Sequence, residues 1–433
     1  MVPKLRKSLS VAVAAAVLVG LTGCVGSGGS TSSSGGDDNS LTIWHAYAGQ
    51  DDKVEFIDWA LEGFQAEHPD ADLRIVAAEQ SSYKTKLQTA MSTGDVPDVF
   101  YTLPGGYLDA FVESGQVANL DDELAKDGWG DSFIPASLES VTFDGSTYAV
   151  PIDIDAAVIW YNTKLFESKG WQVPTTWDEF LALCDTIAKD DIVPVALGNK
   201  DGWPATFWYQ YPMMRVEGSG IVTAFANGDD DASFGSNAAD AAEALATLAD
   251  RKFLPTGANG MSDQEANLLF LNSQAAMVLN GTWQIGMSTD APDEFDLGYF
   301  PFPTMADGKG DPTDVLAGVA ASFAMSEKAS DNELAIDFLR YMTSEEVMKK
   351  YVELRKTMVT LKEATTPDIA GPVLAGVVQD VIEPAEHLDP FYDTTMPPKA
   401  TTVYYSTLQG VIEGSVTADE AAKAIDEAVR AGK

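Results

Sequence analysis

Asp153 and Asp155 are the residues whose type and spacing most directly suggest chemistry. They interrupt an apolar stretch, Tyr148 to Asn162, which has the pattern of two strands, one on each side of the acids. Pro151 is expected to break the strand ladder just before them. Side chains two residues apart on an extended chain point to one face, so both carboxylates would project into the same space. Charged groups in such a place require water or a polar ligand.

This carboxylate pair leaves two kinds of function open. The acids could bind a polar ligand, or they could act as the catalytic pair of a secreted glycoside hydrolase, which needs carboxyl groups about 5 to 9.5 Å apart. The sequence contains no Walker motif, no G-x-G-x-x-G after a strand, no H-E-x-x-H and no G-x-S-x-G. His45, His68 and His387 also lack the spacing of metal ligands. We therefore predict a binding protein rather than an enzyme, with neither metal nor cofactor.

Aromatic side chains suggest what such a protein would bind. The segment from Trp203 to Tyr211, W-P-A-T-F-W-Y-Q-Y, concentrates rings, hydroxyls and an amide. Flat rings cover the apolar faces of a sugar, whereas carboxylates and amides accept hydrogen bonds from its hydroxyl groups. Aromatic residues together with aspartates therefore indicate a carbohydrate ligand, although any single ring by itself is more simply explained as part of the protein core.

Length and charge narrow the class of protein further. A chain of 433 residues is too long for one ordinary core and suits two lobes. The formal net charge of −39 repels phosphates and other anions, so nucleic acid is a poor partner and a neutral ligand is favoured. Solubility outside the cell would explain the same charge.

The N-terminus has the features of an exported protein. Residues 1–23 combine a basic start with a short apolar run, as a signal peptide does. The segment L-T-G-C, ending at Cys24, resembles the bacterial lipobox, whose cysteine is lipidated and becomes the first residue of the mature protein. The Gly- and Ser-rich residues 24–40 then form a flexible linker. The alternative to lipidation is an ordinary signal peptide that is cleaved off, with Cys24 present by coincidence. Cys184 is expected to be a buried, inert thiol on a helix.

The chain after the linker alternates between strand and helix patterns. Strands are expected at 41–44, 73–76 and 96–101, with helices at 54–64 and 83–91 between them. This order predicts a mainly parallel sheet covered on both faces, which binds ligands at the carboxyl ends of its strands. Capping boxes are expected to start three later helices, with the pairs Thr176 and Glu179, Thr343 and Glu346, and Thr417 and Glu420.

Several segments together resemble one family. They are G-S-T-Y-A-V-P at 145–151, V-I-W-Y-N-T-K-L-F at 158–166, V-P-T-T-W-D-E-F at 173–180, A-A-M-V-L-N-G-T-W at 275–283 and A-G-V-A-A-S-F-A-M-S at 317–326. The chain from about Leu41 onward resembles the carbohydrate-binding proteins of ABC importers, of the maltose-binding-protein-like family 1. The resemblance implies a type II periplasmic-binding-protein-like α/β fold with two lobes, a hinge and a cleft. Lobe 1 would comprise 41–153 and 320–357, and lobe 2 would comprise 154–319 and 358–433.

The resemblance also implies roles for individual residues. Asp155 falls where the family has a hinge-side carboxylate that binds sugar hydroxyls, and Asp153 is its neighbour or a solvent-exposed acid. Trp208 and Trp283 fall at positions of stacking aromatics, the latter next to Gly281. Further candidate ligand-binding residues are Trp44, His45, Tyr47, Tyr83, Tyr101, Trp203, Tyr404, Tyr405 and Arg355, the last of which could instead be a surface charge.

We therefore expect a monomeric substrate-binding protein, lipid-anchored through Cys24 on the outer face of the bacterial cytoplasmic membrane. By resemblance, it would capture a neutral di- or oligosaccharide by closing two lobes around it and present it to the permease subunits of an ABC importer. A secreted glycoside hydrolase and a surface adhesin are the alternatives.

Overall fold

The computed structural model describes residues 39–226, 229, 232–234, 237–362 and 364–431, which belong to one compact unit, Asp38–Lys433. The predicted signal peptide, the lipidated Cys24 and the linker up to residue 38 lie outside the described residues. None of the described helices is long and apolar enough to cross a membrane.

The first sheet follows the strand order β12-β6-β11-β3-β1-β2, and β13 also pairs with β11. Its strands are β1 (Ser40–His45), β2 (Asp72–Ala77), β3 (Val99–Thr102), β6 (Ala149–Ala156), β11 (Val315–Met325), β12 (Met358–Val359) and β13 (Leu388–Asp389). The three predicted N-terminal strands are confirmed as β1, β2 and β3, and β1 pairs in parallel with both of the others. Their carboxyl ends therefore lie at one edge of the sheet.

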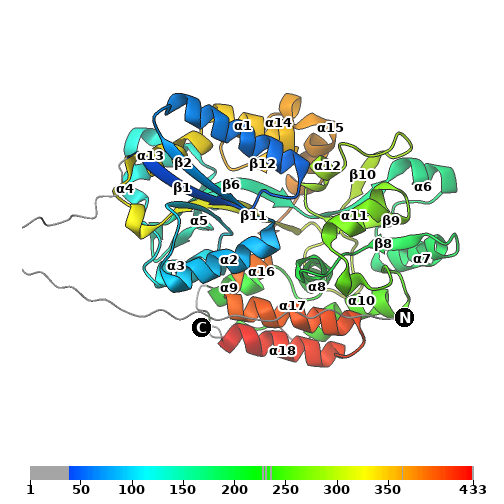
Figure 1. Ribbon diagram of the computed structural model, residues 1–433. Helices are drawn as coiled ribbons and strands as arrows, with labels where there is room; N and C mark the ends of the chain where they lie inside the picture. The colour runs from blue at the N-terminus through cyan, green and yellow to red at the C-terminus, as the bar shows by residue number, and fades with distance from the viewer. Residues whose placement is uncertain (1–38, 227–228, 230–231, 235–236, 363, 432–433) are drawn as a thin grey trace, which may run out of the picture. The chain divides into compact units, whose positions relative to one another are not determined.

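The two predicted N-terminal helices are also confirmed, as α1 (Asp51–Glu67) and α2 (Gln80–Thr93). On α1 the buried residues Phe56, Ile57, Ala60 and Phe64 recur at helical spacing, so this face packs on the sheet. Figure 1 shows α1 together with α14 (Glu345–Arg355) on one face of the sheet, and α2 with α3 (Gly106–Glu113) on the other.

The second sheet follows the strand order β10-β7-β9-β8. Its strands are β7 (Val158–Asn162), β8 (Val193–Ala196), β9 (Ala275–Asn280) and β10 (Leu297–Phe300). Around it lie α6 (Thr163–Lys169), α7 (Trp177–Ala188), α8 (Trp203–Val216), α10 (Ala238–Asp250), α11 (Asp263–Leu271) and α12 (Gln284–Met287). Because β8 and β9 are parallel neighbours, their carboxyl ends open toward the same edge, where α8 and α12 begin.

The chain passes between the sheets at Ala157, the residue between β6 and β7. Strand β6 pairs with β11 on one side and with β12 on the other, so three segments that are distant in sequence lie side by side. Two expectations need correction here. Strand β6 continues through Pro151, with only a register shift against β11, and Asp153 and Asp155 lie inside β6 rather than at a joint between strands.

Two of the three predicted capping boxes are confirmed. Thr176 caps α7 together with Glu179, and Thr417 exchanges hydrogen bonds with Glu420 at α18 (Ala418–Ala431). The box at Thr343 is wrong, because α13 (Glu333–Met342) ends there and the Thr343 hydroxyl donates to the carbonyl of Leu339. Helix α14 starts one residue later, from the cap of Ser344.

The remaining elements are short or lie near the C-terminus. They are β4 (Thr142–Phe143), β5 (Ser146–Thr147), α4 (Asp121–Leu124), α5 (Pro135–Glu139), α9 (Ile221–Ala226), α15 (Pro367–Val377), α16 (Tyr392–Thr395) and α17 (Pro398–Ile412). Helices α17 and α18 run side by side and pack on α10 (Figure 1). The C-terminal helices therefore cover the α8 and α10 side of the second sheet.

Buried apolar residues form separate clusters around the two sheets. The first core contains residues from 41–152 and 321–374, whereas the second contains residues from 157–316 and 391–429. A third, smaller cluster lies under the crossing strands and includes Trp160, Phe270 and Val377. The buried Cys184 lies in the second core, on α7, as expected.

Candidate ligand-binding site

Two half-buried indoles lie where β8 and β9 end. Trp203 opens α8 and Trp283 directly precedes α12, and their ring centroids are 5.8 Å apart in an edge-to-face arrangement. Phe207 and Phe391 pack behind them, at 6.3 Å from the Trp283 ring. A Cβ on Gly281 would stand 2.1 Å from the Trp283 ring, so this indole requires a glycine beneath it. Partly exposed rings of this kind are suited to stack on a ligand.

Asp155 is a buried residue that connects strand β6 to two other segments through hydrogen bonds. Asp155 is 1% exposed. Its Oδ1 accepts hydrogen bonds from the hydroxyls of Thr282 and Thr357, each at 2.5 Å. Burial raises the pKa of the carboxyl, while these two hydrogen bonds lower it. Asp155 therefore fixes the loop that carries Trp283 and is enclosed by protein in this conformation.

Asp153 lies beside it on the same strand and is 3% exposed, so the alternative of a solvent-exposed acid is wrong. The Tyr351 hydroxyl donates to Oδ2, whereas Oδ1 is buried without a hydrogen-bond partner. Burial and the neighbouring Asp155 raise the pKa of Asp153. This oxygen therefore keeps its capacity to accept a hydrogen bond.

Arg355 is likewise buried, at 2% exposure, so the alternative of a surface charge is wrong. Its guanidinium pairs with Asp52 in the first turn of α1 and lies over the ring of Tyr351. The Nε of Arg355 has no hydrogen-bond partner. This residue therefore links α14 to α1 beside the two β6 aspartates.

The aromatic candidates in and near β1, β3 and α2 are mostly packed inside the first core. Tyr47 lies edge-on to Tyr101 at 5.5 Å, and its buried hydroxyl has no hydrogen-bond partner. Tyr83 donates to the carbonyl of Tyr101 at 2.8 Å. His45 is 4% exposed, and burial lowers its pKa to about 4. Trp44 is half-buried and instead faces Lys86, 4.8 Å from its ring.

Two predicted ligand-binding residues, one of them a predicted stacking residue, are buried in the core. Trp208 is 1% exposed and packs against Phe180 and Phe302, so neither face of its ring is free. Tyr404 is fully buried, and its hydroxyl donates to the carbonyl of Thr206. Both belong to the second core because α8 and α17 turn these side chains inward. Tyr405 is half-buried and donates to Asp393 at 2.6 Å.

Five charged residues that the sequence analysis did not single out approach the same region. Asp153 and Asp155 raise the pKa of Lys53, Lys53 lowers and Asp201 raises the pKa of Asp263, and Asp393 and Asp201 raise the pKa of Lys84. Lys53 lies in the first turn of α1 and Lys84 in the second turn of α2, and each of these helices follows a strand of the first sheet. Their position after a strand was the one sign in the sequence that they could belong to the site. Many charged residues follow strands, so only the packing distinguishes these two from the others.

The elements on the two sides of this region are in contact. A Cβ on Gly286 in α12 would stand 2.7 Å from Oδ2 of Asp52 in α1. A Cβ on Gly106, the first residue of α3, would stand 2.7 Å from the carbonyl oxygens of Thr395 and Met396 at the end of α16. The candidate residues are therefore enclosed between two cores that meet on both sides of them.

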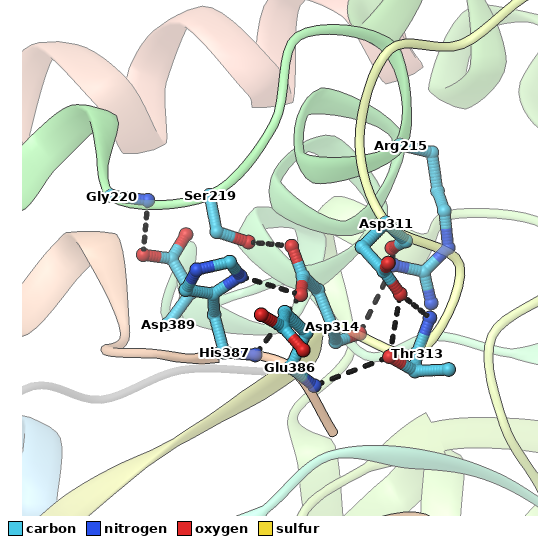
Figure 2. Close-up of polar contacts among 9 residues, drawn as sticks. All are labelled: Arg215, Ser219, Gly220, Asp311, Thr313, Asp314, Glu386, His387 and Asp389. Carbon is cyan, nitrogen blue, oxygen red and sulfur yellow. Dashed lines mark hydrogen bonds and ion pairs between the residues drawn. The ribbon is translucent and has the colours of Figure 1, made fainter. Parts of the chain in front are cut away.

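A second buried polar cluster lies elsewhere, at the start of β11 (Figure 2). The Arg215 guanidinium donates to the carbonyls of Phe302, Asp311 and Asp314, and Asp314 accepts from Ser219 and His387. These bonds tie the segment before β13 to the start of β11. The cluster positions backbone, so we assign it a structural role.

The arrangement as a whole defines a class of protein. Two α/β lobes with separate cores are joined by side-by-side crossing strands, and polar and aromatic residues face each other at the strand ends between them. This is the type II periplasmic-binding-protein-like fold, and the predicted fold class is confirmed by solved structures that match across nearly their whole length.

The family follows from the sequence comparison. The model of the bacterial extracellular solute-binding proteins matches residues 25–349, and the chain belongs to this family. The resemblance to binding proteins of ABC importers is thereby confirmed at the level of the family.

The chain is similar to several named proteins and to solved structures. The "Multiple sugar-binding protein" of Streptococcus mutans is 26% identical over 309 residues, 70% of this chain and 71% of the relative. The "Diacetylchitobiose binding protein DasA" of Streptomyces coelicolor is 27% identical over 360 residues, 78% of each chain. A solved structure from work on xylan utilization by Caldanaerobius polysaccharolyticus has a TM-score of 0.82 at 26% identity, covering 90% of this chain and 99% of the other. A "Chitin oligosaccharide binding protein" shares the fold, with a TM-score of 0.83 at 24% identity, covering 92% and 99%.

Proposed function

We propose that this protein is the substrate-binding component of an ABC sugar importer and captures a neutral di- or oligosaccharide between its two lobes. The observation that carries the proposal is the pair of half-buried indoles, Trp203 and Trp283, together with the buried polar atoms of Asp153 and Arg355 that lack partners. A sugar has both the apolar faces that indoles cover and the hydroxyls that such atoms bind. Relatives named as sugar-binding proteins support the same ligand class.

The lobes are proposed to divide as the sequence indicated, near 41–153 with 320–357 and near 154–319 with 358–433. The packing favours one change to these bounds. Val359, Leu361 and Leu374 belong to the first core, so the last passage of the chain from lobe 1 to lobe 2 would come after residue 374. A ligand stabilises the closed state only through contacts that it makes better there than in the open state. We assign such contacts to Trp283 on one side and Lys53 on the other.

Membrane attachment through a lipid on Cys24 remains part of the proposal. The L-T-G-C segment supports it, and two or more acyl chains anchor a protein stably. Mass spectrometry of the mature N-terminal peptide tests it, since a diacylglyceryl cysteine adds a defined mass. A Cys24→Ser variant should be released from cells into the medium.

The hydrolase alternative gains no support from the carboxylate pair. Asp155 is bonded to Thr282 and Thr357 and is almost fully buried, so it is not placed to reach a glycosidic bond in this conformation. Assays for reducing sugar released from oligosaccharides check this prediction, and sustained release by purified protein would refute it.

Isothermal titration calorimetry against a panel of sugars tests the proposed function directly. The panel should include maltose, raffinose, diacetylchitobiose, and cello-, xylo- and fructo-oligosaccharides. We expect saturable binding of at least one neutral sugar with one site per chain. A protein that binds none of them, while remaining folded, would contradict the proposal.

A further inference from the structure

Phe391 is a buried ring that lies behind the half-buried indole of Trp283. It is 4% exposed, and its centroid lies 6.3 Å from that of Trp283 and 5.4 Å from that of Phe207. The ring of Phe207 in turn lies 5.5 Å from that of Trp203. These four rings therefore form one group, in which each of these spacings is within the range of favourable aromatic contact. Of the four, only the two indoles are partly exposed.

One side chain holds the backbone on both sides of Phe391. Gln210 of α8 is fully buried, and its Nε2 donates to the carbonyl of Pro390 at 2.7 Å, while its Oε1 accepts from the N–H of Tyr392 at 3.0 Å. A primary amide can make this pair of hydrogen bonds, whereas an apolar side chain of the same size can make neither. Gln210 therefore fixes the direction in which the Phe391 side chain leaves the backbone.

The chain around Phe391 is also attached to the crossing strand β11. Strand β13, which ends two residues before Phe391, pairs in parallel with the start of β11. A Cβ on Gly318 in β11 would stand 3.5 Å from Cα of Pro390 and 3.8 Å from Cδ2 of Phe391, so this segment lies close beside the strand. Gly318 is the partner of Asp155 in the pairing of β11 with β6.

Trp283 is thus located by two attachments that start from paired positions of β6 and β11. Asp155 of β6 holds the loop through the hydroxyl of Thr282, and Phe391 beside β11 supports the ring from behind. A Cβ on Gly281 would stand 2.1 Å from the same ring, so backbone borders the indole there as well. A ring that is confined in this way loses less freedom when a ligand covers its open face.

We propose that Phe391 and Gln210 are positioning residues for sugar binding. Phe391 holds the Trp283 indole in the orientation that stacks on the ligand, and Gln210 acts through Phe391. Both are buried behind the indole, so they affect the affinity through it rather than by touching the sugar. The affinity is raised because the orientation needed for binding is already present before the sugar arrives. The inference rests on the proposed function and adds to it the residues that prepare its stacking ring.

A double-mutant cycle measures whether Phe391 acts through Trp283. The probe is the sugar of the calorimetric panel that the unchanged protein binds most tightly. Phe391→Leu should weaken its binding about fivefold, the loss expected for one aromatic contact. In the Trp283→Ala protein the same substitution should cause no further loss, since the ring that Phe391 supports is gone. Gln210→Met keeps the volume and removes both hydrogen bonds, and it should behave like Phe391→Leu in both proteins.

Acrylamide quenching of fluorescence reports on the indole without any sugar. The chain has nine tryptophans, so the signal of Trp283 is the difference between each protein and the same protein carrying Trp283→Phe. Phe391→Leu and Gln210→Met should each increase the quenching of this signal, since the indole becomes more mobile and more accessible. Phe253→Leu is the control, because it removes a ring from the second core beside Arg251 and should leave quenching and affinity unchanged.

A loss of affinity that disappears in the Trp283→Ala protein, together with stronger quenching, would support the inference. A purely structural role would lower the melting temperature without either change. Unchanged affinity, a loss that adds to that of Trp283→Ala, or unchanged quenching of Trp283 would overturn it.

Melting temperatures report whether each variant folds, and Phe391→Leu or Gln210→Met alone is sufficient for the comparison. A protein that binds no sugar of the panel would refute the proposed function. The quenching measurement would then decide by itself whether Phe391 positions the indole, and it also decides if Trp283→Ala binds too weakly for calorimetry.

Discussion

The hydroxyl of Thr282 donates a hydrogen bond to Oδ1 of Asp155 at 2.5 Å, which joins the loop after β9 to the crossing strand β6. Thr357 donates to the same oxygen from the other side. One carboxylate thus holds three separate segments of the chain, and the indole of Trp283 follows directly after one of them. The geometry of the site and the stability of the hinge are therefore linked through Asp155.

Asp155→Ala is expected to lower the free energy of unfolding by about 2 kcal/mol, because two buried hydroxyls lose their acceptor. It should also weaken sugar binding at least tenfold, because the loop that carries Trp283 loses its attachment. Chemical denaturation and calorimetry measure the two effects. Asp240→Ala, at an exposed position, is the control. Retained stability together with unchanged affinity would show that the hydrogen bonds of Asp155 to Thr282 and Thr357 have no role.

Trp283→Ala should weaken sugar binding at least tenfold, which corresponds to about 1.4 kcal/mol. The reason is loss of a half-exposed ring that stacks on the ligand, and calorimetry measures the change. Trp59→Ala, which removes a half-buried indole from α1 near Lys350, should leave the affinity unchanged. If the two variants lost affinity equally, a general effect of indole removal would be the better explanation.

Gly106→Ala is expected to hinder lobe closure. The added Cβ would stand 2.7 Å from the carbonyl oxygens of Thr395 and Met396, so α3 and α16 would have to separate. We expect at least tenfold weaker sugar binding and a larger radius of gyration, by small-angle X-ray scattering, at saturating sugar. Gly260→Ala is the matched control, since nothing lies within 4 Å of the added Cβ. Normal closure in Gly106→Ala would show that the contact is dispensable.

Asp389→Asn should change how stability depends on pH. Burial raises the pKa of Asp389 to about 6, so between about pH 4 and pH 6 the folded protein keeps a proton that the unfolded chain has lost. The stability contributed by this group is present below pH 4 and is lost as the pH rises through 6, by about 3 kcal/mol. The amide still offers an oxygen to the N–H of Gly220, which binds Asp389 in the native protein.

Calorimetric melting of both proteins from pH 4 to pH 8 measures this effect. The variant should gain stability relative to the unchanged protein between pH 4 and 6, with a constant difference above pH 7. His387 also makes the stability depend on pH, because its hydrogen bond to Asp314 raises its pKa. Both proteins should therefore also carry His387→Gln. Parallel stability profiles across the whole range would contradict the assignment to Asp389.

The alternation of strands and helices could be predicted from sequence because it depends on local patterns. The apolar spacing of Val54, Ile57, Leu61 and Phe64 predicts this helix. The face that the structure buries carries Phe56, Ile57, Ala60 and Phe64, so the helix was correct and its buried face only in part. The N-terminal strands and two capping boxes were correct for the same reason. The box at Thr343 failed because Ser344, the adjacent hydroxyl residue, caps the helix instead.

The site could be predicted only in part. Sequence alone determined that Trp283 follows a strand and an N-G turn, that two aspartates share one face of a strand, and that the chain resembles extracellular binding proteins. It could not show that Trp208 and Tyr404 are core residues or that Asp155 joins the loop before Trp283 to strand β6, since these facts depend on how distant segments pack. Burial and long-range charge contacts are properties of the folded chain, and only the tertiary structure decided them.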